Sequence, residues 1–398
     1  MRIAVILESS IQLGGGFQQE FSTICLLNKS KGGHEFIFYT TRKENIGILS
    51  RQGIQAKLLN TSSIFHKIYA RISRHRTIYE LLGRSKAPFE MALIEDKADI
   101  VYFLSPSWLA LSLKKLNYVI TIWDLCHRDH PEFPEISSHG EFDIREDFVR
   151  NVSTRAVAVL VNFESLKTDL VRRYGCDPER IYIAKLLPSV GTISGSLVYV
   201  KKKYSINNPY IFYPAQCWPH KNHVYILDGL KVLRDKFNLT IDAVFSGSDK
   251  GNLGFVLDQA QKLGLKDNVH YVGFVPNEEI ASFYKEALAL VMPTYFGPTN
   301  IPPLEAFALG CPVCYSDLPG LRDQVGNAAF LMDLDDPASL AGHIRTILND
   351  PQAVREKVSL GKQVILGWSE ADYSQVLKGV FDKYSKKMRS WKNDGGQK

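Results

Sequence analysis

The sequence predicts an α/β protein with two doubly wound parallel-sheet domains in series, and three observations support this. The chain has 398 residues, which exceeds the length that a single hydrophobic core usually supports. Two domains of under about 200 residues each are therefore expected. Strand-like apolar runs alternate with helical-period segments along the chain, the pattern of parallel sheets covered by helices on both faces. This alternation pauses only once, near the middle.

The predicted elements are short runs rich in β-branched and aromatic residues, with amphipathic segments between them. The expected strands are Arg2–Leu7, Glu35–Thr40, Ile100–Phe103, Tyr118–Trp123, Val157–Asn162, Ile181–Ala184, Tyr210–Tyr213, Thr240–Ser246, Val269–Val272, Ala289–Met292, Pro312–Tyr315 and Ala329–Met332. The expected helices include Gln18–Lys29, Glu164–Tyr174, Asn222–Lys236, Gly254–Leu263 and Pro302–Leu309.

The pause covers residues 186–208, whose Pro, Gly and Ser residues predict an interdomain linker. We therefore expect a Rossmann-like domain at 1–190, a second one at 205–375, and a basic C-terminal helix or tail at 376–398 that packs back on the first domain. Doubly wound sheets bind ligands at the carboxyl ends of their strands. If those ends face one another, the active site is the cleft between the domains.

The composition is that of a globular protein, with 45% hydrophobic and 23% charged residues. No apolar run approaches the roughly 18 residues of a membrane-spanning helix. The apolar run that follows Met1 lacks the length and the cleavage site of a signal peptide and is expected to be a buried strand. These features predict a cytoplasmic protein.

The six cysteines are scattered and do not form a disulfide framework. Cys311 and Cys314 form a CxxC pair, which raises the possibility of redox chemistry or zinc binding. However, the pair follows a helical segment and enters a strand, the reverse of a thioredoxin-like motif, and two further zinc ligands are not evident. Buried structural cysteines and no metal site are expected.

Two basic stretches stand out from a modest net charge of +6. Residues 66–86 contain six Lys/Arg and one Glu, and residues 376–398 contain seven Lys/Arg and two Asp. The first interleaves its charges with Ile, Tyr and Leu, which is typical of a helix on an anionic membrane surface. A solvated basic face over a packed apolar one explains it equally well. Nucleic acid is not an expected partner, because no base-reading motif accompanies the charge.

A glycine-rich turn follows the first strand. Gly14, Gly15 and Gly16 allow close approach of a ligand and can direct backbone N–H groups at an anion. The turn is not a G-x-G-x-x-G motif, and no acidic residue ends the second strand, so a dinucleotide-dependent dehydrogenase is disfavoured.

An aspartate ends the apolar strand Tyr118–Trp123. At that place the Asp124 carboxylate would enter the cleft, where it can orient or deprotonate a hydroxyl. Capping of the next turn is the alternative. His127 and His130 follow without an evident third metal ligand, so both are expected to line the cleft.

Two segments of the second half suggest a binding site for a diphosphate. Lys221 and Asn222 open a helix after a strand, where a lysine can neutralise an anionic leaving group; a solvated lysine is the alternative. In the second segment, prolines start a helix after Asn300 and Ile301, whose N–H groups face the ligand. Glu305 lies one turn into that helix, within reach of ribose hydroxyls.

The sequence PPLEAFALGCPV at residues 302–313 resembles the PPLEAMACGTPV element of the retaining family 4 glycosyltransferases, which have the GT-B fold. The other motifs occur in that family's order: the Gly-rich loop, the Asp motif, the Lys-Asn loop and the VGFVP at residues 272–276. The resemblance thus spans nearly the whole chain.

The resemblance implies a nucleoside diphosphate sugar as donor substrate, held by the second domain, with no cofactor. The base would lie near Phe274 and Val275, the ribose on Glu305, and the diphosphate on Lys221 and the N–H groups near Asn300 and Ile301. The acceptor would bind near Gly15, Gly16 and Asp124. The remaining donor-binding residues that it implies are Gln216, His220, Asn222, Gly247 and Thr299.

Three residues depart from the family pattern. Gly297 stands where the family has its first glutamate, so Thr299 and Asn300 are expected to take over contacts to the donor sugar. Gln216 replaces an arginine, so Lys221 and His220 must carry more of the phosphate charge. Trp123 replaces a histidine, which removes a histidine role there.

The expected function is metal-independent hexosyl transfer with retention, from a nucleoside diphosphate sugar to a saccharide hydroxyl. The basic stretches suggest a lipid-linked acceptor at the inner face of the cell membrane, as in assembly of a bacterial surface polysaccharide such as the lipopolysaccharide O-antigen. The alternatives are a sugar-nucleotide epimerase, a glycan phosphorylase, or a catalytically silent nucleotide-sugar-binding subunit, which Gly297 and Gln216 favour.

Overall fold

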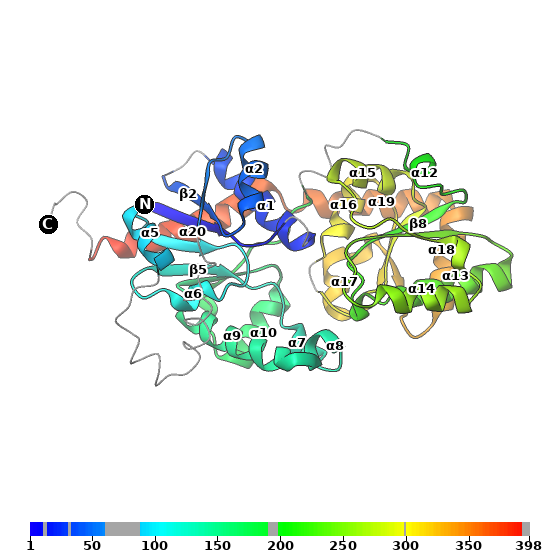
Figure 1. The fold of residues 1–398 in the computed structure, drawn as a ribbon, viewed down its shortest axis with the longest axis horizontal. Coiled ribbons are helices and arrows are strands. Elements are labelled where there is room, and N and C mark those ends of the chain that lie inside the picture. The colour runs from blue at the N-terminus through cyan, green and yellow to red at the C-terminus, as the bar shows by residue number, and fades with distance from the viewer. Residues whose placement is uncertain (11–13, 31–32, 60–87, 190–197, 298–299, 392–398) are drawn as a thin grey trace. The chain divides into compact units, whose positions relative to one another are not determined.

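The computed structural model describes residues 1–10, 14–30, 33–59, 88–189, 198–297 and 300–391 (Figure 1). The chain divides into two compact units, each built on its own parallel sheet. Unit 1 comprises Met1–Leu125, Asp143–Lys185 and Glu370–Lys398, and unit 2 comprises Cys126–Phe142 and Leu186–Ser369. The predicted fold class, two doubly wound α/β units, is confirmed.

The sheet of unit 1 has seven parallel strands in the order β3-β2-β1-β4-β5-β6-β7. Its strands are β1 (Arg2–Leu7), β2 (Glu35–Thr40), β3 (Ala56–Leu58), β4 (Ile100–Phe103), β5 (Asn117–Thr121), β6 (Ala158–Val161) and β7 (Ile181–Ile183). The central strands β1, β4 and β6 are almost continuously apolar and buried, because helices cover both faces of the sheet. The direction of strand addition reverses between β1 and β4.

The helices of unit 1 connect these strands and cover the sheet. They are α1 (Gly15–Lys29), α2 (Lys43–Arg51), α5 (Pro88–Glu95), α6 (Leu109–Ser112), α9 (Glu141–Arg155, which begins within unit 2), α10 (Glu164–Tyr174), η3 (Pro178–Arg180) and α20 (Glu370–Met388).

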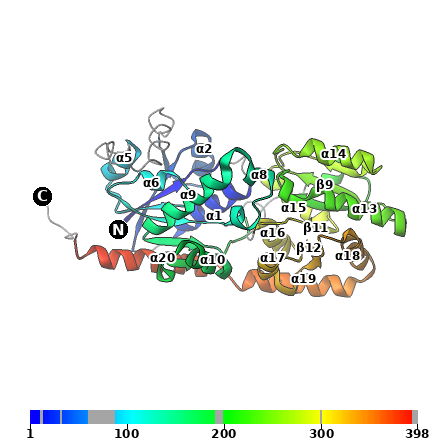
Figure 2. The ribbon, with the colours of Figure 1, turned by 90° about the horizontal axis from the view of Figure 1, so that it is seen from below.

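Helix α20 is the C-terminal element of unit 1 and lies along that unit in Figure 2. Phe381 makes edge contacts with the rings of Phe36 in β2 and Tyr102 in β4. Its hydroxyl-bearing residues bond to distant parts of the unit: Tyr373 Oη lies 3.3 Å from Thr23 Oγ1 and Tyr384 Oη accepts a bond from Asn117. Helix α20 is therefore built into the core of unit 1.

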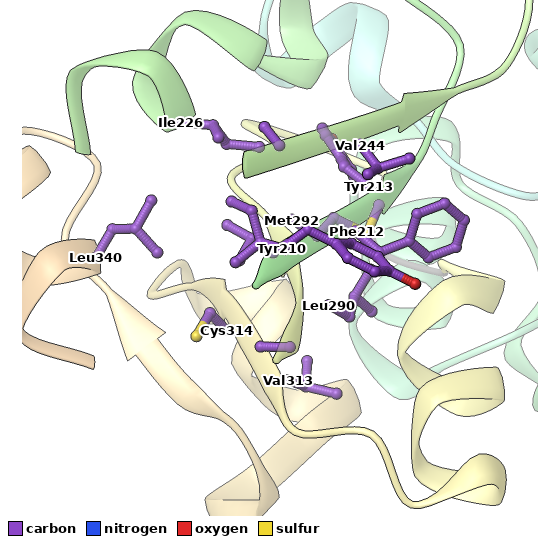
Figure 3. Close-up of a cluster of buried hydrophobic side chains, with 14 of the residues drawn as sticks. Tyr210, Phe212, Tyr213, Ile226, Val244, Leu290, Met292, Val313, Cys314 and Leu340 are labelled. Carbon is purple, nitrogen blue, oxygen red and sulfur yellow. The ribbon is translucent and has the colours of Figure 1, made fainter. Parts of the chain in front are cut away.

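The sheet of unit 2 has six parallel strands in the order β10-β9-β8-β11-β12-β13. They are β8 (Tyr210–Pro214), β9 (Asp242–Ser246), β10 (Val269–Tyr271), β11 (Ala289–Met292), β12 (Val313–Ser316) and β13 (Phe330–Met332). Figure 3 shows part of the core around them, with Tyr210, Phe212 and Leu290 packed between strands and helices. Here the direction of strand addition reverses between β8 and β11.

The helices of unit 2 complete its two outer layers. They are α7 (Cys126–Asp129), α8 (Pro134–Ser137), η2 (Ser138–Gly140), α12 (Val200–Lys203), η4 (Pro219–Lys221), α13 (His223–Phe237), α14 (Leu253–Lys262), η5 (Lys266–Asn268), α15 (Asn277–Glu286), α16 (Ile301–Leu309), α17 (Pro319–Val325), η6 (Gly326–Ala328), α18 (Pro337–Asn349) and α19 (Pro351–Leu366).

The division into units differs from the expected boundaries at 190, 205 and 375 in two respects. Segment 126–142 belongs to unit 2, although it lies in the first half of the sequence. The described part of the expected linker 186–208 also belongs to unit 2: Leu186 packs with Ile301 and Leu304, and Val200 and Ile206 enter the main core. Burial of these apolar residues outweighs the local Pro, Gly and Ser content.

Strand β3 was missed because only three residues pair with β2, too few to show a period. All six cysteines are buried and outside any disulfide, and burial raises the pKa of Cys311 to about 12. The basic stretch 66–86 lies outside the described residues, as does the tail from residue 392. No helix in the described part of the chain is long and apolar enough to cross a membrane.

Candidate functional site

The predicted donor-binding residues lie in loops at the carboxyl ends of the strands of unit 2. Strand addition reverses between β8 and β11, and the loops 215–222 and 293–300 follow these two strands. Such a switch point is where doubly wound sheets open a crevice for ligands. Gly247 follows β9, and Phe274 and Val275 follow β10 at the same edge of the sheet.

Lys221 is the central cation of this edge. It ends η4, and its carbonyl accepts a 2.9 Å bond from Tyr213 Oη, which ties the loop back to β8. Asn222 turns the chain with a left-handed φ of 53° and precedes α13. Lys221 Nζ then reaches across to the other loop, 3.4 Å from Thr294 Oγ1 and 3.3 Å from Asn300 Oδ1.

Asn300 occupies the space beside the position where the family has its first glutamate. Its Nδ2 donates to the Gly297 carbonyl and, at 2.6 Å, to Tyr315 Oη. A Cβ at Gly297 would lie 3.3 Å from Asn300 Oδ1 and 3.5 Å from Lys221 Nζ, and the φ of 97° favours glycine there. The partner of Lys221 at this place is therefore a neutral amide oxygen. Thr299 lies outside the described residues.

The start of α16 offers fewer amide donors than the sequence suggested. Pro302 and Pro303 have no N–H group. The Asn300 N–H donates to Gln324 Oε1 at 3.2 Å, and Gln324 Nε2 donates back to the Asn300 carbonyl at 2.6 Å. A diphosphate would have to displace Gln324 to use the Asn300 amide, which leaves the Ile301 N–H as the main donor.

Glu305 is buried in the first turns of α16. Its Oε2 accepts a 2.9 Å bond from Tyr284 Oη of α15. Burial, and then the charge of Glu305, raise the pKa of Tyr284, so this hydroxyl stays a donor. The carboxylate is thus held in one orientation by a tyrosine that the sequence did not single out.

Gln216 and Gly247 bring two neighbouring loops together. Gln216 Oε1 accepts a 3.0 Å bond from Trp218 Nε1, which fixes the amide, while its buried Nε2 has no hydrogen-bond partner among the described residues. Gly247 has a φ of 137°, and a Cβ there would lie 2.6 Å from the Ala215 carbonyl oxygen. Gln216 Nε2 is therefore an available donor where the family has an arginine.

Phe274 presents a half-exposed ring at the end of β10, whereas Val275 is buried in the core. The Gly247 N–H donates to the Gly273 carbonyl at 2.8 Å, which joins the β9 and β10 loops. An exposed aromatic ring beside this pair of loops is suited to contact a nucleobase.

His220 has a partner that sequence reasoning missed. Glu135 of α8 pairs with its Nδ1 and also accepts a 3.2 Å bond from its backbone N–H. The imidazole stacks on Phe296, with centroids 3.9 Å apart, and His130 stacks with the same phenylalanine. Glu135 and His220 are 85 positions apart in the chain, so no local sequence pattern indicates that they pair.

Among the predicted residues of unit 1, Gly16 lies near Ser9, whose hydroxyl bonds to the buried carboxyl group of Glu20. Gly15 and Gly16 open α1, and a Cβ at Gly16 would lie 3.0 Å from the indole of Trp123. Asp124 follows β5 and is half-buried. At the switch point itself, Glu20 accepts 3.1 Å bonds from the backbone N–H groups of Glu8 and Ser9.

This arrangement differs from the predicted anion-binding turn. The first backbone N–H groups after β1, those of Glu8 and Ser9, donate to the carboxyl group of Glu20. A second carboxyl group, that of Glu8, lies beside it. Burial, reinforced by the charge of Glu20, raises the pKa of Glu8 from 4.5 to about 7, and burial raises that of Glu20. Acidic surroundings of this kind favour hydroxyl groups over phosphate as ligands. The sequence signal for this pair is Glu8, whose carboxyl group directly follows the last residue of β1.

Within the described ranges, no group of three or more His, Cys, Asp or Glu side chains is arranged to hold a metal ion.

Residues 200–363 match the sequence profile of a family described as glycosyl transferases group 1. The chain is 30% identical over 200 residues to the O-antigen chain mannosyltransferase RfbU of Salmonella typhimurium, covering 50% of this chain and 53% of that protein. It is 26% identical over 270 residues to O-antigen chain mannosyltransferase B of Escherichia coli, covering 65% and 67%. The first of these matches thus spans about half the length of the relative.

Solved structures show the same fold over nearly the entire chain. HepE of Anabaena, crystallised with UDP and glucose, superposes with a TM-score of 0.72 at 16% identity, covering 97% of this chain and 100% of that one. Sucrose-phosphate synthase from Thermosynechococcus elongatus gives 0.73 at 17% identity, covering 96% and 99%. The chain accordingly has the GT-B fold, and its residues 200–363 match the sequence profile of the glycosyl transferases group 1 family.

Proposed function

We propose that the protein is a hexosyltransferase that moves a sugar, with retention of anomeric configuration, from a nucleoside diphosphate sugar to a saccharide hydroxyl. One observation carries the proposal. Lys221, Asn300 and Thr294 converge at the switch point of unit 2, within the region that matches the family. A cation at this place suits the diphosphate of a leaving nucleotide.

In the proposed reaction the bond between the anomeric carbon and the diphosphate oxygen breaks while the acceptor oxygen bonds to that carbon. Lys221 and His220 stabilise the negative charge that develops on the leaving diphosphate, and the Gln216 amide adds a neutral donor. Fixed charges of this kind supply the largest catalytic contribution in many enzymes. The acceptor hydroxyl gives its proton to Asp124 or to the departing phosphate.

The remaining donor-binding residues contact other parts of the nucleotide sugar. Glu305, oriented by Tyr284, binds the ribose, and the base lies along the backbone of Phe274 and Val275. Gly247 and Asn222 shape the loops, and Ile301 donates its N–H to the diphosphate. Thr299 and Asn300 contact the donor sugar.

We propose that transfer requires no divalent ion and no cofactor, because Lys221, His220 and the α16 amide supply positive charge to the diphosphate. Full activity after exhaustive treatment with EDTA is the expected result. Loss of activity in EDTA that manganese restores would contradict it.

For the acceptor we propose a lipid-linked saccharide at the inner face of the cell membrane, bound near Gly15, Gly16 and Asp124. Support comes from the two relatives named as O-antigen chain mannosyltransferases and from the basic residues of α20. Mannose is accordingly the first sugar to test. Cosedimentation with anionic vesicles at low salt is expected, and absence of the protein from the pellet would count against membrane contact.

The direct test is a thermal-shift screen with UDP, GDP, dTDP and their sugars, followed by transfer assays with the donor that stabilises the protein. A ligand at a hundred times its dissociation constant adds about 2.7 kcal/mol to the free energy of unfolding. Stabilisation by none of these nucleotides would refute the proposed donor class.

Gly297 favours a second candidate, a nucleotide-sugar-binding subunit without catalytic activity, because the family's carboxylate is missing there. Donor binding without transfer to saccharide acceptors would support it. An epimerase is distinguished by conversion of the donor sugar in the absence of any acceptor.

A further inference from the structure

Segment 126–142 contributes an anion to the loop that carries Lys221. Glu135 lies in the short helix α8, and its side chain is only 6% exposed, while that of His220 is 11% exposed. Its Oε1 meets both the ring Nδ1 and the backbone N–H of His220. One carboxylate oxygen thus holds the position of the main chain and the orientation of the ring.

The other side of the His220 peptide is held as well. Its carbonyl accepts a 2.9 Å bond from the Tyr295 N–H and lies 3.4 Å from Thr294 Oγ1. The loop of Lys221 is therefore fixed between α8 on one side and the loop after β11 on the other. Because Lys221 follows directly, the location of its ammonium group depends on these bonds.

The charge of the pair follows from its surroundings. Glu135 and His220 lie among the rings of Phe133 and Phe296, where an isolated carboxylate would be costly. The bonds from His220 outweigh this burial and hold the pKa of Glu135 below its usual range. An ionised carboxylate at this place in turn favours a protonated imidazole.

Other titratable groups also face the pair. They are Lys221 in the same loop, His223 at the start of α13, His130 with its partner Glu132 at 3.5 Å, and Tyr295 after β11. The positive charge of Lys221 favours the neutral imidazole, whereas Glu135, in direct contact with the ring, favours the protonated one. His223 adds no charge, because burial lowers its pKa to about 3.

We propose that Glu135 is a positioning residue that keeps His220 protonated and fixes the Lys221 loop, so that a nucleoside diphosphate meets two adjacent cations in place of the missing arginine at Gln216. The choice of a nucleoside diphosphate as ligand rests on the proposed function, whereas the contact between Glu135 and His220 does not depend on it. The neutral Gln216 explains why a second cation is needed at this edge of unit 2.

The first measurement is independent of any ligand. Histidine ring signals are followed by NMR against pH, with His220→Gln used to assign the His220 signal. The wild-type ring is expected to stay protonated through neutral pH. Glu135→Gln retains an oxygen for the His220 N–H but removes the charge, so its His220 should titrate at least about one pH unit lower. An unchanged titration in folded Glu135→Gln overturns the proposal.

The second measurement uses UDP and GDP as probes in calorimetric titrations at two pH values. Loss of a charged donor predicts about tenfold weaker binding of the preferred nucleotide to Glu135→Gln near pH 8, with the difference shrinking near pH 6 as the imidazole regains its proton. Glu135→Ala, which also releases the backbone, should weaken binding further at both pH values. Binding equal to wild type in both variants overturns the proposal.

Glu132→Gln is the matched control, because it removes a carboxylate from the same segment whose side chain is 65% exposed. It should change neither the His220 titration nor nucleotide affinity. If the wild type binds none of UDP, GDP and dTDP, the proposed function fails, and the histidine titration still decides whether Glu135 holds His220 protonated.

Discussion

Nζ of Lys221 lies 3.3 Å from Oδ1 of Asn300, which joins the loops that follow β8 and β11 at the switch point of unit 2. The oxygen is that of a neutral amide, so this contact orients the ammonium group without cancelling its charge. Gly297, where the family has a glutamate, leaves room for this contact, because it has no side chain beside the two atoms. Lys221 thus places a positive charge at the edge of unit 2 where we propose that a diphosphate binds.

Replacement of Lys221 by alanine is expected to lower kcat about 100- to 1000-fold, a loss of about 3–4 kcal/mol of transition-state stabilisation. The reason is that a fixed charge beside the leaving group acts mainly in the transition state. Steady-state transfer assays measure the effect, and circular dichroism checks the fold. Lys231→Ala, on the outer side of α13 and paired with Asp235, is the control. Near-normal turnover of Lys221→Ala would exclude its assigned role.

Gly247→Ala is expected to destabilise unit 2 by about 3 kcal/mol, since it combines an unfavourable φ with a backbone collision. Its Cβ would lie 2.6 Å from the Ala215 carbonyl oxygen. Gly251 also has a positive φ, of 93°, but nothing lies within 4 Å of its Cβ, so Gly251→Ala should cost only about 1 kcal/mol. Thermal unfolding of the two variants separates collision from strain; equal melting temperatures would contradict the close approach.

Glu8→Gln is expected to stabilise unit 1 increasingly as the pH rises. Burial, aided by Glu20, raises the folded-state pKa of Glu8 from 4.5 to about 7. Stability from the protonated form is therefore fully present below pH 4.5 and is lost as the pH rises through 7, by up to about 3 kcal/mol.

Glutamine keeps the neutral form at every pH, so the variant should gain relative to wild type between these two values. Chemical denaturation across this range measures the difference. The exposed Glu44 in α2 provides the control Glu44→Gln. A difference between Glu8→Gln and wild type that does not change with pH would refute the assigned ionisation.

His223→Phe is expected to make unit 2 less sensitive to acid. Burial lowers the pKa of His223 from 6.5 to about 3, with a further contribution from the charge of Lys221. The neutral ring therefore stabilises the fold above pH 6.5, and this stability is lost as the pH falls towards 3, amounting to about 2 kcal/mol at pH 5.

Phenylalanine fits beside the rings of Tyr213 and Phe245 that surround His223. It also replaces two ring nitrogens that have no hydrogen-bond partner in the described part of the chain. Urea unfolding at about pH 7.5 and pH 5 tests this. The exposed His139 gives the control His139→Asn; acid sensitivity of His223→Phe equal to wild type would disprove the explanation.

The sequence by itself determined the fold class and the edge of unit 2 at which the candidate site lies. Strands such as β1 and β11 match their predicted bounds, and helix α10 does as well, because apolar periodicity and helix boundaries are encoded over a few neighbouring residues. The loops that bear Lys221 and Asn300 follow predicted strands, so parallel-sheet geometry places both at one edge.

Only the tertiary structure decided which side chains meet there. Glu135 lies far from His220 in the sequence, Tyr284 reaches Glu305 from another helix, and Gln324 takes up the Asn300 amide. Segment 126–142 and the expected linker both join unit 2 for the same reason. Buried polar groups need hydrogen-bond partners and apolar side chains need to be buried, and the completed fold supplies these contacts from residues far apart in the sequence. A local sequence pattern therefore does not predict which residues meet.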